Sequence, residues 1–314
     1  MPHLLAAQAT RTAVIDIGSN STRLLVADVV DGRVEEIDRR TRVTRLGRGV
    51  DTSGQLSADS VEAVCETVAG YVAAYEEAGV DAVAAFATSA VRDASNGDAF
   101  VAELRERFAL TARVLDGDSE ARLTYRGATA SRPPTVPTLV ADIGGGSTEL
   151  TVGTGSDLAF HTSLQAGVVR HTERRISSDP PTASELEELA GDVRGLLDAA
   201  MADHPEAHAD AAIAVAGTPT SLAAIELELD PYDPQRVHGH TLGMSSIQTM
   251  LSRLASLPTA ERAETVGLHA DRAPTIVAGV VILIELMRAF GLEEIGVSEH
   301  DILHGAALEL ALAD

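Results

Sequence analysis

The chain has 314 residues, enough for two domains of ordinary size, and 45% of them are hydrophobic, which permits a core in each. Its net charge of −23 excludes a general nucleic-acid binder, because such proteins need a basic face. No segment has the apolar length of a membrane span, and Met1 to Ala9 lacks the features of a signal peptide, so we expect a cytoplasmic protein with no membrane partner. Cys65 is the only cysteine, which excludes an intrachain disulfide; its helical setting predicts a buried, inert thiol.

The first motif is a hairpin predicted over residues 11–30. An apolar strand runs into Asp16, a polar turn follows at Gly18-Ser19-Asn20, and a second apolar strand begins. A third strand is predicted over 33–43, and the densest basic run of the chain lies at its end. We favour guidance of an anion for this run over a solvated, salt-bridged loop. Its members are Arg39, Arg40, Arg42, Arg45 and Arg48.

Helices and strands alternate after the basic run. Helices are predicted over 56–78, with Ser57 as N-cap, and over 96–107, and strands over 80–88 and 112–115. Arg92 follows Thr88 and Ser89 at a strand-to-helix junction. Such a junction can bind phosphate, although a capped helix with a surface arginine is the alternative. Gly117 opens a further helix. For Glu120, in the first turn of that helix, the local pattern alone favours a capping role.

The stretch Leu139 to Leu150 repeats the pattern of the first hairpin. An apolar strand ends in Asp142, the turn Gly144-Gly145-Gly146-Ser147 follows, and Glu149 lies at the start of the next strand. Glycines leave backbone N–H groups open to an anion, Asp142 is placed to hold a hydrated metal, and Glu149 to orient water or metal. A glycine-rich hairpin is the alternative. Because the motif occurs twice, we predict a duplicated fold whose two turns face each other across a cleft.

The proline-rich segment 132–137 marks the clearest break between the two halves. Beyond the second hairpin and a strand over 158–164, a helix is predicted over 182–201 and a strand over 211–216. That strand ends at Gly217-Thr218, before a helix over 222–229, which again suits a phosphate. For His238 and His240 we favour a structural role over metal ligation. The remaining predictions are helices over 245–254, 258–266, 273–290 and 300–312, and a strand over 294–298.

Five segments taken together resemble the exopolyphosphatase and guanosine-pentaphosphate phosphohydrolase (Ppx/GppA) family in order and spacing. They are Asp16 to Arg23, Ala87 to Arg92, Gly117 to Ala121, Asp142 to Glu149 and Gly217 to Leu222. The resemblance implies an α/β fold of duplicated ribonuclease-H-like domains, as in the actin-like ATPase superfamily, with the active site in the interdomain cleft. It implies domains over 1–125 and 126–299, with a closing helix, 300–314, that packs back on the first.

The resemblance also implies roles for individual residues and a cofactor, Mg²⁺ or Mn²⁺. Glu120 is similar to the catalytic glutamate of the family, which reverses the capping role, and Glu149 to a second acidic residue that assists. The metal is assigned to Asp142, Asp16 and Glu149. Substrate phosphate is assigned to Asp16, Gly18, Ser19, Asn20, Arg92, Gly144, Gly145, Gly146, Ser147, Gly217 and Thr218.

The implied activity is hydrolysis of the terminal phosphoanhydride of inorganic polyphosphate, of short chains because the extra C-terminal domains of long family members are lacking. The alternatives are a guanosine-pentaphosphate 5′-phosphatase, a non-hydrolytic nucleotide- or polyphosphate-binding regulator, and a kinase. The family also implies a homodimer. One departure from the family pattern lies near the closing helix. This chain has Leu303-His304-Gly305 where the family often has Arg-Glu-Gly, which could alter metal or substrate preference.

Overall fold

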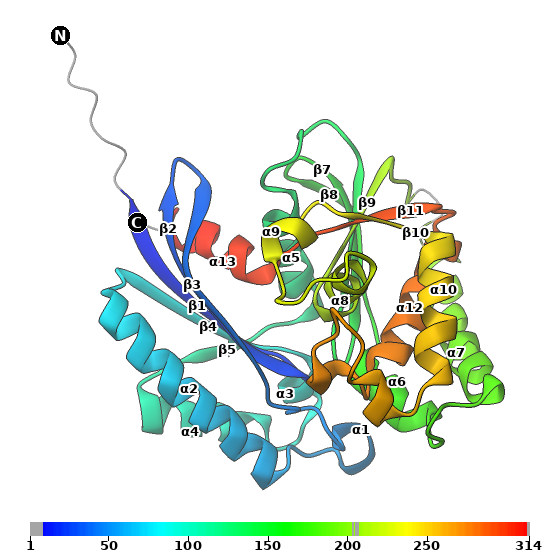
Figure 1. Cartoon of the computed structure of the whole chain (residues 1–314). Helices are drawn as coiled ribbons and strands as arrows, with labels where there is room; N and C mark the ends of the chain where they lie inside the picture. The colour runs from blue at the N-terminus through cyan, green and yellow to red at the C-terminus, as the bar shows by residue number, and fades with distance from the viewer. Residues whose placement is uncertain (1–8, 203, 205–206, 313–314) are drawn as a thin grey trace.

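The structure is a computed structural model that describes residues 9–202, 204 and 207–312 (Figure 1). Two predictions fall partly outside the described residues. They concern residues 1–8, which make up most of the segment predicted not to be a signal peptide, and residues 313–314, the end of the predicted closing helix. Two mixed β-sheets form the framework, each with helices on both faces. Among the described residues, no helix is both long enough and apolar enough to span a membrane.

The first sheet has the strand order β3-β2-β1-β4-β5. Strand β1 pairs antiparallel with β2 and parallel with β4. The strands are β1 (Thr10–Ile17), β2 (Ser21–Val30), β3 (Arg33–Val43), β4 (Ala82–Ala87) and β5 (Ala112–Val114). The helices of this half are α1 (Val50–Ser53), α2 (Ala58–Ala78), α3 (Ser89–Asp93) and α4 (Gly97–Phe108).

The second sheet repeats that order with one more edge strand, as β8-β7-β6-β9-β11-β10. Its strands are β6 (Thr138–Ile143), β7 (Thr148–Thr154), β8 (Asp157–Leu164), β9 (Ala211–Val215), β10 (Thr241–Gly243) and β11 (Glu294–Val297). Its helices are α6 (Val168–Arg175), α7 (Ala183–Ala202), α8 (Gly217–Glu226), α9 (Pro234–Val237), α10 (Met244–Ser256), α11 (Thr259–Arg262), the 3₁₀ turn η1 (Ala270–Arg272) and α12 (Ile276–Ala289). The predicted duplicated α/β fold is confirmed.

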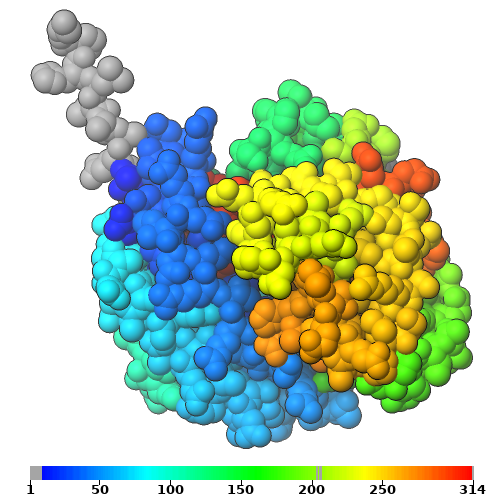
Figure 2. Space-filling model, in the orientation of Figure 1, coloured from blue at the N-terminus to red at the C-terminus, as the bar shows by residue number. Residues whose placement is uncertain are grey.

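Two helices, α5 (Gly117–Thr129) and α13 (Ile302–Leu310), fill the space between the sheets. Alternate residues of β1 point to opposite faces, so Ile15 packs under α2 and α4 while Val14 packs under α13. Strand β6 repeats this division, because Ala141 packs under α12 while Val140 packs against α5. In the space-filling view the red closing helix is visible only in a narrow gap between the two halves (Figure 2).

Helix α5 belongs to the packing of both halves. Leu123 lies in the apolar cluster of the first sheet with α13, whereas Tyr125 and Ala128 lie in a cluster with the second sheet. The predicted boundary between residues 125 and 126 therefore falls inside α5, and the division into 1–125 and 126–299 stays a prediction.

Local capping follows the sequence closely, but two helix predictions were wrong in extent. Ser57 caps α2 by accepting from the Ser60 backbone N–H, and Gly79 ends the helix in the left-handed region. Cys65 is a fully buried residue of α2, and burial raises the pKa of its thiol to about 11. The helix expected over 222–229 begins at Gly217, and of the helix expected over 258–266 only α11 forms.

The crossing of α5 and α13 depends on two glycines. A Cβ built on Gly305 would lie 1.8 Å from the Leu123 carbonyl oxygen, and one on Gly127 would lie 1.9 Å from the Asp301 carbonyl oxygen. Both distances are far below van der Waals contact, and the obstructing atoms are backbone. The two helices can pack at this distance only with glycine at both positions.

We expect Gly305→Ala to lower the free energy of unfolding by about 3 kcal/mol or more, because the added methyl forces α13 away from α5. Gly191→Ala in α7 is the matched control, since nothing lies within 4 Å of the added Cβ. The control should be neutral or stabilise by about 0.5–1 kcal/mol. Urea unfolding of the two variants measures the difference, and equal stabilities would contradict the role given to the crossing.

Candidate active site

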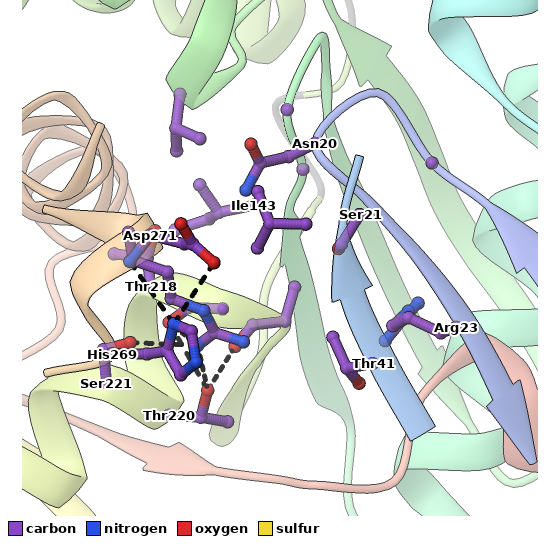
Figure 3. Close-up of a pocket in the computed structure, with 18 of the residues that line it drawn as sticks. Asn20, Ser21, Arg23, Thr41, Ile143, Thr218, Thr220, Ser221, His269 and Asp271 are labelled. Atoms are coloured by element: carbon purple, nitrogen blue, oxygen red, sulfur yellow. Dashed lines mark hydrogen bonds and ion pairs between the residues drawn. The ribbon is translucent and has the colours of Figure 1, made fainter. Parts of the chain in front are cut away.

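A cleft of about 870 Å³ lies between the two halves of the molecule and is lined by both. Figure 3 shows part of it, where Ser21, Arg23 and Thr41 of the first half lie opposite Thr218, Thr220 and Ser221 of the second. The cleft is also polar at the carboxyl ends of β1 and β6, where the two predicted turns begin.

The two turns have the same hydrogen-bond geometry. Gly18 N donates to Ser21 O at 3.0 Å, and Gly144 N donates to Ser147 O at 3.0 Å. They also touch, because a Cβ on Gly145 would lie 2.9 Å from Asn20 N, and one on Gly146 would lie 3.1 Å from Ser19 Oγ. The glycines are thus required by the close approach of the two turns as well as by their shape.

At the first turn, one arginine holds two carboxylates. Arg23 donates to Asp16 Oδ2 from Nε at 2.9 Å and from Nη2 at 2.6 Å, and its Nη1 contacts Asp301. Burial raises the pKa of Asp16 although Arg23 opposes it, whereas at Asp301 the nearby arginines outweigh burial and lower the pKa. Asp16 Oδ1 is buried without a hydrogen-bond partner.

Glu120 faces the cleft from the first turn of α5 and is only 7% exposed. The cap of that helix is Asp116, which accepts from the Ser119 backbone N–H at 2.8 Å, so the capping role that the local pattern favoured for Glu120 is wrong. Arg92 Nη1 donates to Glu120 Oε2 at 3.2 Å and to the Leu115 carbonyl at 2.8 Å. Burial, then the charges of Glu149 and Asp142, raise the pKa of Glu120 well above its ordinary range, against the effect of Arg92.

Asp142 and Glu149 occupy paired positions on β6 and β7. Asp142 Oδ2 accepts from Thr124 Oγ1 at 3.3 Å, and Glu149 Oε1 accepts from Ser163 Oγ at 2.7 Å. Burial and the Glu149 charge raise the pKa of Asp142 to about 8, and burial also raises the pKa of Glu149. Neither carboxylate has an arginine within ion-pair distance among the described residues.

Most of the predicted phosphate-binding residues line the cleft, and three of the predicted site residues do not. Those that line it are Asp16, Gly18, Ser19, Asn20, Gly144, Gly145, Ser147, Gly217 and Thr218, with Glu120 and Asp142. Arg92 and Glu149 are not part of the cleft lining, but their charges change the pKa of Glu120. Gly146 instead lines a small adjoining space. Ser19 Oγ also bonds Ser89 Oγ at 2.8 Å, so part of its role is to join the turn to α3.

Three arginines that hold the turns or the cleft walls in place were not predicted as separate functional residues. Arg23 belongs to the first predicted motif but was given no role of its own. Its position opposite Asp16 on the paired strand was a usable signal for an ion pair. Arg272 donates to the Gly217 carbonyl at 2.7 Å and to Ser221 Oγ at 2.9 Å, and Arg170 donates to the Gly146 carbonyl at 2.7 Å. Within the predicted basic run, Arg39 and Arg42 line the cleft, and Arg45 pairs with Asp271 at 3.3 Å.

The donor set suits a hard divalent cation. Asp16 and Asp142 offer buried carboxylate oxygens, and the unpartnered Oδ1 of Asp16 lacks any compensating donor. Mg²⁺ and Mn²⁺ prefer oxygen ligands, and Mg²⁺ keeps several waters while using one or two carboxylates. Among the described residues, no three ligand atoms of Asp16, Asp142 and Glu149 lie within 4.8 Å of one another, so a cation here would bind at most two of these carboxylates directly.

The fold and the cleft define an α/β protein in which two matched turns and a set of buried carboxylates face one interdomain site. The profile of the Ppx/GppA phosphatase family matches residues 25–313, and the chain belongs to that family.

Relatives and solved structures agree with this assignment. The chain is 35% identical over 316 residues to "Exopolyphosphatase 2" of Mycobacterium tuberculosis, covering 96% of this chain and 99% of that protein. It is 27% identical to the "Guanosine-5'-triphosphate,3'-diphosphate pyrophosphatase" of Pseudoalteromonas translucida, covering 91% of this chain and 56% of that protein. The crystal structure of the Aquifex aeolicus family member aligns with a TM-score of 0.83 at 32% identity, over 98% of this chain and 99% of that one.

The buried carboxylates predict an unusual dependence of stability on pH. A carboxyl whose pKa rises on folding binds more protons in the folded chain, so its stabilising contribution is complete near pH 4 and is lost as the pH rises through the folded pKa, about 8 for Asp142. His171, His238 and His300, whose pKa values burial lowers, act in the opposite direction, but only while the unfolded imidazoles titrate near their ordinary pKa of about 6.5. We therefore expect the free energy of unfolding in EDTA to fall as the pH rises from about 7.5 to about 9, through the folded pKa of Asp142 at about 8.

Urea unfolding across this pH range measures the fall, and Asp142→Asn should reduce it because the amide does not titrate. Glu106→Gln is the control, since Glu106 is an exposed carboxylate of α4. A stability that is flat or rises over this range in the wild type would contradict the prediction.

Proposed function

We propose that this chain is an exopolyphosphatase that hydrolyses the terminal phosphoanhydride of short inorganic polyphosphate and releases orthophosphate. The observation that carries the proposal is the Glu120 carboxylate, buried in the cleft beside Arg92 and next to the two glycine turns. The full-length similarity to a protein named exopolyphosphatase supports the same assignment.

The residues of the chain divide the work between binding and positioning. The turns at Gly18 and Gly144 bring backbone and hydroxyl groups to the cleft, where they hold the terminal phosphoryl group. Glu120 directs the attacking water, and its raised pKa makes it a better proton acceptor near neutral pH. Arg92 keeps the Glu120 carboxylate in place. Phosphoryl transfer depends mostly on positioning and electrostatics, so these groups suffice without a covalent step.

Asp16 and Asp142 are the residues that would hold Mg²⁺ or Mn²⁺. Glu149 is not part of the cleft lining. When bound, the cation neutralises the charge that develops on the transferred phosphoryl group. In this chain, with its net charge of −23, a cation in the cleft would also offset the repulsion between the carboxylates and an anionic substrate.

A guanosine-pentaphosphate 5′-phosphatase is the second candidate, favoured by the relative named a guanosine pyrophosphatase and by a cleft volume large enough for a nucleotide. Phosphate release from short polyphosphate, long polyphosphate, guanosine pentaphosphate and ATP, each with Mg²⁺, ranks the candidates. Binding of these compounds without phosphate release would favour a non-hydrolytic regulator instead. A homodimer and a cytoplasmic location stay predictions.

We expect Glu120→Gln to lower kcat for phosphate release by about 10²–10⁴-fold with little change in KM, because the amide cannot accept a proton from water. Asp118→Asn is the matched control, in the same helical turn but exposed, and should keep full activity. Steady-state phosphate release measures both. Wild-type activity in Glu120→Gln would remove Glu120 from the reaction and, with it, the observation on which the proposal rests.

We expect Arg92→Gln to move the acidic limb of the kcat–pH profile to higher pH. Arg92 lowers the pKa of Glu120 against the effect of burial, so its removal means that more alkaline conditions are needed to ionise that carboxyl. Arg122→Gln, an exposed change on the same helix, should leave the profile unchanged. An unshifted limb with a raised KM would instead place Arg92 on the substrate phosphate.

A further inference from the structure

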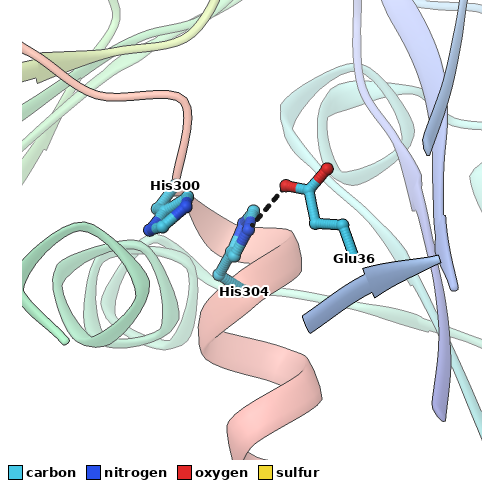
Figure 4. Close-up of side chains that lie close together, drawn as sticks. All are labelled: Glu36, His300 and His304. Atoms are coloured by element: carbon cyan, nitrogen blue, oxygen red, sulfur yellow. Dashed lines mark ion pairs between the residues drawn. The ribbon is translucent and has the colours of Figure 1, made fainter. Parts of the chain in front are cut away.

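Three imidazole rings stack near the start of α13, outside the set of catalytic residues. The ring centroids of His238 and His300 lie 4.2 Å apart, and those of His300 and His304 lie 4.0 Å apart. Glu36, from β3 of the first sheet, reaches the same place. Figure 4 shows its carboxylate directed at the His304 ring, with His300 beside that ring at the beginning of the helix.

Two imidazoles and one carboxylate are in position to bind an ion. Ligand atoms of Glu36, His300 and His304 all lie within 4.8 Å of one another. His304 Nε2 lies 2.9 Å from Glu36 Oε1. In a tetrahedral site with bond lengths of about 2.0–2.1 Å, neighbouring ligand atoms are about 3.3 Å apart. The pair of Glu36 and His304 therefore needs to open by only about a few tenths of an ångström, and the His300 nitrogen lies within 4.8 Å of both.

His304 is the most informative member of this group. It is 1% exposed, yet neither of its ring nitrogens makes a hydrogen bond of acceptable geometry, and the short approach to Glu36 is an ion-pair contact without that geometry. A buried imidazole without hydrogen bonds is costly unless another partner compensates it. By contrast His238, at the other end of the stack, accepts from the Glu299 backbone N–H at 3.2 Å and thereby fixes its ring.

We propose that Glu36, His300 and His304 form a binding site for a divalent transition-metal ion of the Zn²⁺ class, distinct from the carboxylates Asp16 and Asp142, with Glu36 at the edge of the same cleft. Two imidazoles and one carboxylate are a donor set that Zn²⁺ uses with water as a fourth ligand. Mg²⁺ prefers oxygen ligands alone and would not compete well for this site. Glu36 is 35% exposed, which leaves a path for the ion and room for water.

The local electrostatics allow this binding. Burial and the neighbouring imidazoles lower the pKa of His300 to about 3, so its ring is neutral at pH 7 and its lone pair is available. The two ring planes differ by 25°, so binding both nitrogens to one ion requires the rings to turn out of the stack, a rotation that the broad terminal torsion of histidine allows. Arg39 is the nearby cation, but it lies 3.7 Å from Glu36 Oε1 and only 2.7 Å from Glu299 Oε2, its closer partner.

The test is Zn²⁺ binding to the whole chain in excess Mg²⁺, by isothermal titration, together with the visible absorption of bound Co²⁺. Glu36→Gln, His300→Gln and His304→Gln should each weaken Zn²⁺ affinity at least about tenfold, because losing even an outer partner of a ligand costs about 10–100-fold. His240→Gln is the matched control. His240 also pairs with a carboxylate, Glu226, at 2.5 Å, but that pair does not belong to a three-ligand group among the described residues, so it should leave binding unchanged.

Because His304 is buried, its variant is accepted only if its unfolding in EDTA matches the wild type, whereas the exposed Glu36 variant gives a result in either case. One Zn²⁺ per wild-type chain that Glu36→Gln and His300→Gln both weaken would support the site. No Zn²⁺ binding by the wild type, or binding that these two variants leave unchanged, would overturn it and reduce the stack to ring packing.

Discussion

The structure depends on the placement of a group of buried carboxylates at one cleft, among them Asp16, Glu120 and Asp142, only some of which pair with arginines. Arg23 joins Asp16 to Asp301, and Arg92 holds Glu120, which leaves Asp142 and Glu149 without a cation among the described residues. Burying an unpaired carboxylate costs several kcal/mol or raises its pKa. The unfavourable electrostatic energy of these buried carboxylates is therefore concentrated at the cleft, where a bound divalent cation would lower it.

Duplication explains how this charge comes to be unevenly divided. In the first half Asp16 pairs in register with Arg23, and in the second half Asp142 pairs in the same register with Glu149. One backbone arrangement thus carries a neutralised pair on one side and a doubly acidic pair on the other. The asymmetry resides in one residue of each hairpin, because the turn geometry is the same in both. A cation is accordingly favoured on the side of the second turn.

The parts of the site that the sequence predicted are those that local rules govern. The two turns follow from an apolar strand, an aspartate and a glycine, all within a few positions. Glu120 shows the limit, since helix position alone cannot distinguish a capping carboxylate from one turned inward, and Asp116 took the cap. Long-range partners left no local signal. Asp301 reaches Arg23 across 278 positions, and His304 reaches Glu36 only because α13 returns to the first sheet.

The start of α13 brings one of the buried carboxylates and two residues of the proposed metal site close together in the sequence. Asp301, which holds Arg23 at the first turn, lies between His300 and His304 in the sequence and caps α13 through the Leu303 backbone N–H at 3.0 Å. Gly305 follows at the crossing with α5, the helix that carries Glu120. A cation bound at Glu36 would fix the segment from His300 to His304 and so restrain Asp301. The residues of the proposed metal site, the arginine clamp and the crossing with α5 thus lie within about six consecutive residues of backbone, a physical connection through which a cation at Glu36 would act on Glu120.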